Sequence, residues 1–97
     1  MVYGVILAPE AVEDLGRLRA ATRTAVLDAI RRHLRHEPTK TSKARIKRLR
    51  GTARPQFRLR VGDVRIFYDV GGQTVEVLAI VTKQDATEWL REAGKAT

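Results

Sequence analysis

Apolar and polar residues alternate through much of the C-terminal half of the chain. Three runs show this period of two, at residues 57–61, 64–70 and 75–81, and the pairs Gly62-Asp63 and Gly71-Gly72 separate them. A period of two is typical of a strand with one buried face, and glycine-containing pairs of this kind form two-residue hairpin turns. The pattern therefore predicts three consecutive antiparallel strands, with Val77 and Ala79 on the same face of the third.

The N-terminal third follows a helical period instead. A short strand-like run at residues 3–7 precedes Pro9, which suits the first position of a helix. Apolar residues then recur at every third or fourth position, as on the buried face of a helix. They are Val12, Leu15 and Leu18 in a first run and Val26, Ile30 and Leu34 in a second. We expect a helical hairpin whose second helix is capped by Thr22 and ends before Pro38.

The end of the chain has helical spacing as well. Ala86, Trp89, Leu90 and Ala93 form an apolar stripe before Gly94, and Thr82 or Asp85 is a candidate cap. Residues 46–49 are expected to form a short edge segment. Residues 1–97 are thus predicted to form a single α+β domain. Its N-terminal strand and helical hairpin pack on a twisted antiparallel sheet, and a short C-terminal helix follows.

Two turns predict the register of the sheet. A two-residue turn at 62–63 pairs Arg60 with Arg65 and Arg58 with Phe67, on the face opposite the apolar one. We expect the helical hairpin to cover the apolar face. Carrying the register through a turn at 71–72 predicts three further pairs, which are Ile66 with Val77, Phe67 with Glu76, and Arg65 with Leu78.

Charge is concentrated in one part of the sequence. The chain has 19 basic and 11 acidic residues, a net charge of +8, and residues 31–65 hold 13 of the basic residues but only two of the acidic ones. This asymmetry predicts a polyanionic partner, and nucleic acid is the commonest. The alternatives are a basic surface kept for solubility and, less favoured, an anionic membrane surface, because no basic amphipathic helix carries large apolar anchors.

Composition excludes several kinds of site. The chain has no cysteine, so disulfides, thiolate metal sites and thiol nucleophiles are ruled out. His33 and His36 lack a recognisable third ligand, and Ser42 lacks a partner for nucleophilic catalysis, so we expect neither metal nor cofactor. The longest apolar run, residues 77–81, is too short to span a membrane, and the N-terminus does not resemble a signal peptide. The prediction is a cytoplasmic protein.

The arginines of the predicted sheet point to phosphate binding. Directly opposed like charges such as Arg60 and Arg65 are unfavourable on a sheet unless an anion lies between them. Arginine forks match phosphate oxygens in two-point geometry. Phe67, beside Arg58, has two possible roles: a surface on which a base stacks, or a core residue beneath the last helix.

The motif around these arginines resembles the RelE/ParE superfamily of type II toxin–antitoxin toxins. The spacing Leu-x-Gly at 49–51 is followed by Arg-x-Arg-x-Gly-x-x-Arg-x-x-Tyr at 58–68, then by a strand and a terminal helix. The preceding strand, helical hairpin and basic loop also fall in the family's order. The resemblance implies a RelE/ParE-like fold and a toxin, with a RelE-like enzyme that cuts mRNA in the ribosomal A site without a metal.

The resemblance also implies roles for individual residues. Arg58 matches a basic side chain at the centre of the site, Arg65 a phosphate-binding arginine, and Lys83 lies near another family arginine, so these three are the predicted catalytic residues. The predicted RNA- or phosphate-binding residues are Lys43, Arg45, Lys47, Arg48, Arg50, Arg60 and Phe67. The expected partners are mRNA on the ribosome and an acidic, RelB-like antitoxin that covers the basic face.

Two departures from the RelE pattern keep other functions open. Trp89 is the aromatic nearest to the place of a C-terminal tyrosine, and Gln56 replaces a basic residue. Neither transfers protons readily, which leaves Lys83 or Glu76 as candidate bases. The alternatives are a ParE-like inhibitor of DNA gyrase and a noncatalytic module that binds RNA or the ribosome.

Overall fold

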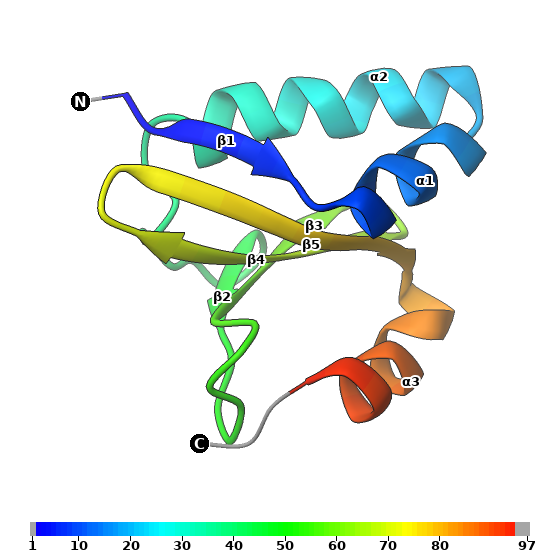
Figure 1. Cartoon of the computed structure of the whole chain (residues 1–97). Helices are drawn as coiled ribbons and strands as arrows, with labels where there is room; N and C mark the ends of the chain where they lie inside the picture. The colour runs from blue at the N-terminus through cyan, green and yellow to red at the C-terminus, as the bar shows by residue number, and fades with distance from the viewer. Residues whose placement is uncertain (1, 95–97) are drawn as a thin grey trace.

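The structure, a computed structural model, describes residues 2–94 (Figure 1). Its elements in chain order are β1 (Gly4–Leu7), α1 (Pro9–Arg17), α2 (Ala20–Ala29), the π-helical turn η1 (Ile30–Leu34), β2 (Ile46–Arg48), β3 (Phe57–Val61), β4 (Val64–Gly71), β5 (Thr74–Thr82) and α3 (Lys83–Ala93). Within the described residues, five strands form one sheet in the order β1-β5-β4-β3-β2. β1 runs parallel to β5, and the other neighbours are antiparallel.

The sheet separates two helical layers. Figure 1 shows α1 and α2 on one side of the sheet and α3 on the other, following the end of β5, which pairs with the start of β4. The predicted α+β fold is confirmed, including the hairpin on the apolar face and the C-terminal helix. The N-terminal strand does more than pack on the sheet, because it extends the sheet at the β5 edge.

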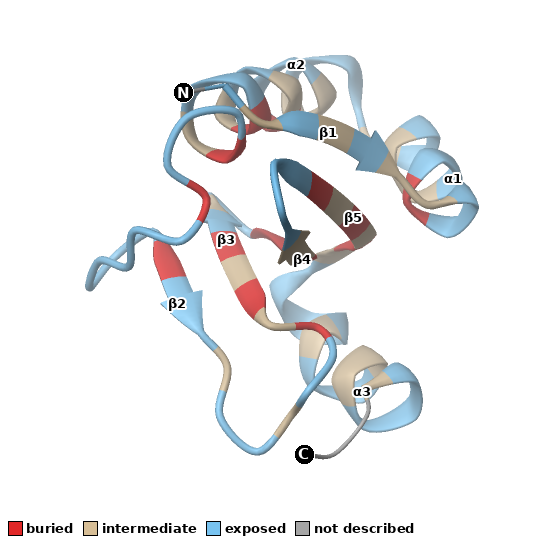
Figure 2. Ribbon diagram, turned by 60° about the vertical axis from the view of Figure 1, so that its left-hand side comes forward, coloured by how far each residue is buried: buried red, intermediate tan, exposed pale blue. Residues whose placement is uncertain are grey.

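The apolar core lies between the sheet and the hairpin. Figure 2 shows buried and less buried positions alternating along β3, as expected for a strand with one buried face. The core side chains from the helices are Ala11, Val26, Ile30 and Leu34, and those from the strands include Leu59, Ile66, Tyr68, Val75 and Val77. Each fully buried aliphatic side chain contributes about 1.5–3 kcal/mol, so this layer stabilises the fold.

The first hairpin has the predicted register. Arg60 pairs with Arg65 and Arg58 with Phe67, around a turn in which Gly62 has a φ of 56°. Glycine adopts a positive φ without the steric cost that a Cβ would add. Local turn chemistry is therefore enough to align these two strands.

The register predicted for the second hairpin is wrong. Gly71 pairs with Thr74, so the turn consists of Gly72 and Gln73, with the positive φ at Gly72. Adjacent glycines make both positions sterically acceptable. The observed turn pairs Val70 with Val75, and both then lie against the core.

A bulge then changes the phase of β5. Tyr68 pairs with Val77 but Phe67 pairs with Ala79, so Leu78 is an extra residue on β5. Beyond it, Ile80 joins the main core, whereas Ala79 faces the α3 side with Phe67. The expectation that Val77 and Ala79 share a face is therefore wrong. The pairs predicted for Val77, Glu76 and Leu78 with β4 are therefore not formed. The extra residue at the bulge reverses the alternation of faces along β5.

Side-chain oxygens satisfy backbone groups where the regular pairing ends. β1 pairs with β5 only as far as Val77, and the Asp14 carboxylate accepts a hydrogen bond from the Ile80 N–H at 3.0 Å. Thr82 is the cap of α3, since its side chain accepts from the Asp85 N–H. The helix α2 begins at Ala20 without a side-chain cap, so the predicted cap at Thr22 is wrong.

A buried tyrosine ties the basic loop to the sheet. The Tyr68 hydroxyl donates to the Pro38 carbonyl at 2.6 Å, and burial raises the pKa of that hydroxyl. Pro38 is itself fully buried, and the exposed basic loop before β2 begins just after it. The tyrosine of the sequence motif thus holds a loop in place. Among residues 2–94, no helix has the length and apolar character that crossing a membrane requires.

Candidate functional site

Basic side chains are aligned on the face of the sheet that α1 and α2 leave uncovered. Lys47 of β2 pairs with Arg58 of β3. Two residues further along β3, Arg60 pairs with Arg65, and the Arg60 N–H donates to the Arg45 carbonyl at 2.9 Å. Because residues opposite one another across a ladder share a face, the sheet brings together residues predicted from the sequence to bind phosphate.

Arg58 lies at the centre of this group. It is half-buried, and its Nε is buried without a hydrogen-bond partner among the described residues. Burial lowers the pKa of the Arg58 guanidinium, and the charges of Arg65 and Arg60 lower it further. Arginine still remains protonated at neutral pH. An unpaired donor among like charges is unfavourable, so this position favours an incoming anion.

Arg65 differs from the exposed arginine that the alternation predicts. Only 6% of its surface is exposed, and Nη1 donates to the Gly62 carbonyl at 2.8 Å and to the Val64 carbonyl at 3.1 Å. These bonds hold the guanidinium against the β3–β4 turn, whose carbonyl dipoles offset part of the repulsion from Arg60. Arg65 therefore contributes positive charge to the site and also stabilises the turn.

Phe67 and Trp89 form a small aromatic core beneath α3. Phe67 is fully buried, and its ring stacks on that of Trp89 with centroids 4.8 Å apart and planes 11° from parallel. The core role, one of the two left open by the sequence, is the one observed. Phe67 therefore does not offer an accessible surface for a base and is removed from the set of RNA-contacting residues.

Lys83 begins α3 beside the β3–β4 turn. Its backbone N–H donates to the Asp63 carbonyl at 2.6 Å, and its exposed side chain lines a cavity of about 520 Å³ together with Asp63, Thr82 and Gln84. The cavity lies next to the end of the sheet that carries Arg60 and Arg65, since Thr82 pairs with Val64. Lys83 thus lies at the same end of the sheet as the Arg60–Arg65 pair.

The remaining predicted RNA-binding residues are more scattered. Lys43 and Arg50 are exposed in the segments on either side of β2. Arg48 pairs with Phe57, and its guanidinium carbon lies 5.1 Å from the centre of that ring. Since Phe57 belongs to the main core, Arg48 lies toward the opposite face from Arg58.

Contacts among Arg54, Gln56, Asp69 and Glu76 organise the neighbouring part of this face, and the sequence analysis assigned no role to Arg54 or Asp69. Arg54 forms ion pairs with Asp69 at 3.3 Å and Glu76 at 2.9 Å. The Gln56 N–H donates to Asp69, while its side-chain oxygen accepts from the Val70 N–H. Gln56 therefore extends the pairing of β3 with β4, which accounts structurally for an uncharged residue at this position.

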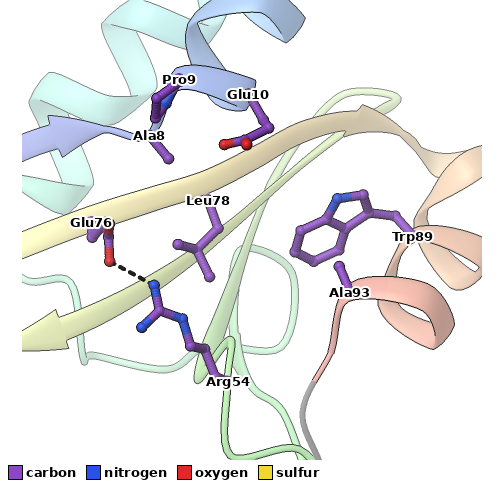
Figure 3. Close-up of a pocket in the computed structure, with 8 residues that line it drawn as sticks. All are labelled: Ala8, Pro9, Glu10, Arg54, Glu76, Leu78, Trp89 and Ala93. Atoms are coloured by element: carbon purple, nitrogen blue, oxygen red, sulfur yellow. Dashed lines mark hydrogen bonds and ion pairs between the residues drawn. The ribbon is translucent and has the colours of Figure 1, made fainter.

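These contacts border a cavity of about 450 Å³ between β5, α1 and α3. Figure 3 shows Trp89 and Leu78 on its apolar wall, with Glu10 and the bonded pair Arg54 and Glu76 around it. Glu76, a candidate base, is already neutralised by Arg54. Its strand neighbour is Asp69 and not Phe67, so it lies farther from Arg58 than the predicted register implies. No local sequence pattern indicates this cavity, because its residues come from distant segments.

The histidines occupy different environments. His33 is half-buried, and burial together with Arg45 and Arg32 lowers its pKa below 6.5, against an opposing effect of Asp28. His36 is exposed. No cluster of three or more histidine, aspartate or glutamate residues suited to a metal ion occurs within residues 2–94.

Comparison with known proteins identifies the family. Residues 5–86 match the family model described as the ParE toxin of the type II toxin–antitoxin system parDE. The toxin–antitoxin complex RelBE2 from Mycobacterium tuberculosis contains a chain 27% identical to this one, with a TM-score of 0.69, and the match covers 84% of this chain and 92% of that one. A chain of the archaeal RelE–RelB complex from Pyrococcus horikoshii is 28% identical, with a TM-score of 0.69, and the match covers 86% of this chain and 97% of that one.

More distant similarity concerns the fold alone. A free-state mutant of Escherichia coli RelE is 21% identical, with a TM-score of 0.57, and the match covers 96% of this chain and 95% of that one. No curated protein matches the sequence. The resemblance found in the sequence motif is nevertheless confirmed, because the family model spans most of the chain. The chain belongs to the ParE toxin family and is a type II toxin–antitoxin toxin of the RelE/ParE superfamily.

Proposed function

We propose that this toxin cleaves mRNA on the ribosome and thereby inhibits translation. The observation that carries the proposal is the buried, unpaired Nε of Arg58 among the charges of Arg60 and Arg65. A phosphodiester placed there would accept hydrogen bonds from the guanidinium. Its charge would also offset the repulsion among the arginines. Arg45 and Lys47 extend the positive surface along the neighbouring strand.

The reaction that fits these groups needs no metal. The ribose 2′ oxygen attacks the adjacent phosphorus while its proton passes to a base. The bond from phosphorus to the 5′ oxygen then breaks, and that oxygen takes up a proton. The products are a 2′,3′-cyclic phosphate and a 5′-hydroxyl end. Negative charge on the phosphorane is greatest during this step, so cations fixed beforehand stabilise the transition state more than the bound substrate.

Within this proposal the chain divides the work between residues. Arg58 holds the phosphate oxygens, Arg65 adds charge from its fixed position on the turn, and Lys83 supplies the proton for the leaving oxygen. The charges that act on Arg58 come from Arg65 and Arg60, and the candidate base Glu76 is paired with Arg54. We infer that the proton acceptor comes from the ribosome–mRNA complex, which makes the activity depend on the ribosome.

Purified toxin in a reconstituted translation system tests the proposal. Mapping the 5′ ends of mRNA is expected to show new ends within codons that occupy the ribosomal A site, and naked mRNA should stay intact. Stalled ribosomes on intact mRNA would instead indicate a noncatalytic module. Translation that continues normally in the presence of folded toxin would contradict the proposal.

Inhibition of DNA gyrase is the second candidate function. The observation that favours it is the family model itself, which describes a ParE toxin and matches residues 5–86. In this case the basic face would contact the gyrase–DNA complex. A supercoiling assay with purified gyrase separates the two functions, because a gyrase inhibitor blocks supercoiling and leaves mRNA uncut.

Salt dependence offers an independent check on nucleic-acid binding. If the basic face engages about five phosphates of a single strand, log affinity should fall with log salt at a slope of about −3.5, given a slope of roughly −0.7 for each phosphate. Fluorescence anisotropy with a noncleavable 2′-O-methyl RNA measures this slope. The salt concentration is varied from about 50 to about 300 mM. A slope near zero would rule out a phosphate-binding face.

We propose an acidic antitoxin as the protein partner. Two of the solved relatives are complexes, namely the toxin–antitoxin complex RelBE2 and the archaeal RelE–RelB complex. The net charge of +8 on this chain favours a partner of opposite charge. A partly disordered acidic segment suits this surface, because an extended segment can cover a large face while it folds.

A further inference from the structure

Two shallow cavities adjoin at the edge of the molecule where η1 approaches the start of β2 and the end of β3. One has a volume of about 250 Å³ and lies against the loop that contains Lys40 and Ser42. The other has a volume of about 290 Å³ and lies against α2 and the end of β3, including Arg60. His33 and Arg45 line both cavities, so they stand at the junction.

The charged groups around this junction are unequally paired. Arg32 binds Asp28 at 3.1 Å, and Lys40 binds Glu37 at 3.5 Å, so these neighbours neutralise one another. Arg45 and Arg60 form no ion pair with any described residue, although their backbones are joined by a hydrogen bond of 2.9 Å. The unbalanced charge at the junction is therefore positive, and it comes from β3 and from the residue just before β2. Such a site favours an anion with more than one oxygen.

The position of Arg45 is held by local contacts. The Ser42 hydroxyl oxygen accepts hydrogen bonds from the Arg45 N–H at 3.0 Å and the Ile46 N–H at 3.3 Å. Ile46 is a core residue, which anchors the same stretch of chain to the sheet. The Arg45 backbone is thus fixed, whereas its side chain is exposed and free of structural ion pairs. A ligand at this place meets a prepared site and orders little of the backbone.

His33 is the titratable group at the junction. The charged groups that act on it are Arg45, Arg32 and Asp28, while Glu37, Lys40 and Arg60 line the cavities that it borders. Burial, Arg45 and Arg32 lower the pKa of the His33 imidazole, which favours its neutral form. A bound anion would reverse part of this effect, since negative charge stabilises the imidazolium.

We propose that His33, Arg45 and Arg60 form a second phosphate site for the nucleic-acid backbone. The site carries the strand around the β2–β3 end of the sheet, away from Arg58 and onto η1. This inference rests on the proposed function, which places the neighbouring phosphate at Arg58. It assigns His33 a role in binding and pH dependence at this second site and no role in the cleavage step.

Histidine NMR on the full chain tests the proposal. The chain contains two histidines, so His36 serves as an internal control. Each imidazole is titrated in chloride and then in inorganic phosphate or a 2′-O-methyl RNA, at constant ionic strength. We expect the apparent pKa of His33 to rise by about 0.5 or more, the effect of one negative charge about 5 Å away in water, and that of His36 to stay unchanged. Equal changes at both histidines, or none at His33, would overturn the site.

Arg45→Gln is the variant that challenges the assignment. Its side chain makes no structural ion pair, so the fold is expected to persist, and the response of His33 to both probes should fall by half or more. Arg31→Gln is the matched control, because Arg31 is exposed on η1 but lines neither cavity. An Arg45→Gln protein whose His33 responds like the wild type would refute the proposal.

The same titration separates this inference from the proposed function. If mRNA is cleaved in an Arg58-dependent manner while His33 does not respond to either probe, the second site is wrong and the function stands. If His33 responds to both probes in a protein that leaves mRNA intact on the ribosome, the second site stands and the cleavage activity is wrong.

Discussion

The two faces of the sheet are built from alternating residues of the same strands, yet they carry opposite properties. On β3, Leu59 is fully buried against the hairpin, while Arg58 and Arg60 on either side face away from it. The hairpin face carries the main apolar core. The other face is covered in part by α3, and it carries basic residues from β2, β3, β4 and the start of α3. Stability therefore resides on the first face and the candidate chemistry on the second.

A similar contrast divides the second face. Arg54 is neutralised by two carboxylates, whereas Arg58 has a buried donor without a partner. Both are arginines in the same basic stretch of sequence, and only their neighbours in space distinguish them. A paired arginine organises the fold, and an unpaired one retains the capacity to bind an anion.

Leu59→Ala is expected to have the largest effect on stability. Removing this fully buried side chain leaves a cavity in the main core, which costs about 2–5 kcal/mol. Urea denaturation followed by circular dichroism measures the loss. A loss below about 1 kcal/mol would mean that the hairpin face is not the close-packed layer described here.

Arg58→Gln should have the opposite profile. We expect single-turnover cleavage on the ribosome to fall about 100-fold, equivalent to about 2.7 kcal/mol in the activation barrier, with the urea midpoint unchanged or higher. The like charges of Arg60 and Arg65 are relieved by the substitution. Arg19→Gln, which removes an exposed charge at the start of α2, is the control and should cleave normally. Undiminished cleavage by Arg58→Gln would refute its assignment.

Arg65→Ala should combine a moderate loss of stability with a loss of cleavage. The truncation leaves the Gly62 and Val64 carbonyls without their side-chain donor, at a cost of about 1–3 kcal/mol. Arg65→Lys keeps the charge but not the planar fork, so it should recover part of the activity and little of the stability. Wild-type stability of Arg65→Ala would show that its contacts with the turn contribute nothing.

The smallest effect is expected in the pH dependence of stability. The pKa of His33 is lower in the folded protein than its ordinary value of 6.5, so the unfolded chain takes up the proton first as pH falls. Stability is therefore lost as pH decreases from about 6.5 toward the folded pKa. His33→Gln should show a smaller loss between about pH 7.5 and 5.5, roughly one unit on either side of 6.5. Identical pH profiles for wild type and His33→Gln would contradict the shift.

Local chemistry made several features predictable. The turn at Gly62 requires glycine, and a two-residue loop leaves one register for its strands. The pairing of Arg60 with Arg65 could therefore be predicted from the sequence. The hairpin, the apolar face and the terminal helix follow from periodicity. The motif at 58–68 and the density of basic residues pointed to the family and to the basic face.

Other features depended on contacts between distant segments. Two adjacent glycines permitted two turns, and packing of Val70 and Val75 against the core selected one of them. The bulge at Leu78 reversed the faces of Ala79 and Ile80, which no pattern within β5 revealed. Register errors of this kind are invisible to a local pattern, because strand pairing is decided by the whole sheet and its core.

The sequence by itself determined the order of the elements, the apolar face of the first hairpin and the excess of positive charge. Each depends on residues close together along the chain. Only the tertiary structure decided which charges are free. It buried Phe67 under Trp89, bound Arg65 to a turn, neutralised Arg54 and left Arg58 unpaired. The physical reason is that burial and pairing are properties of a side chain's neighbours in space, which long-range packing supplies.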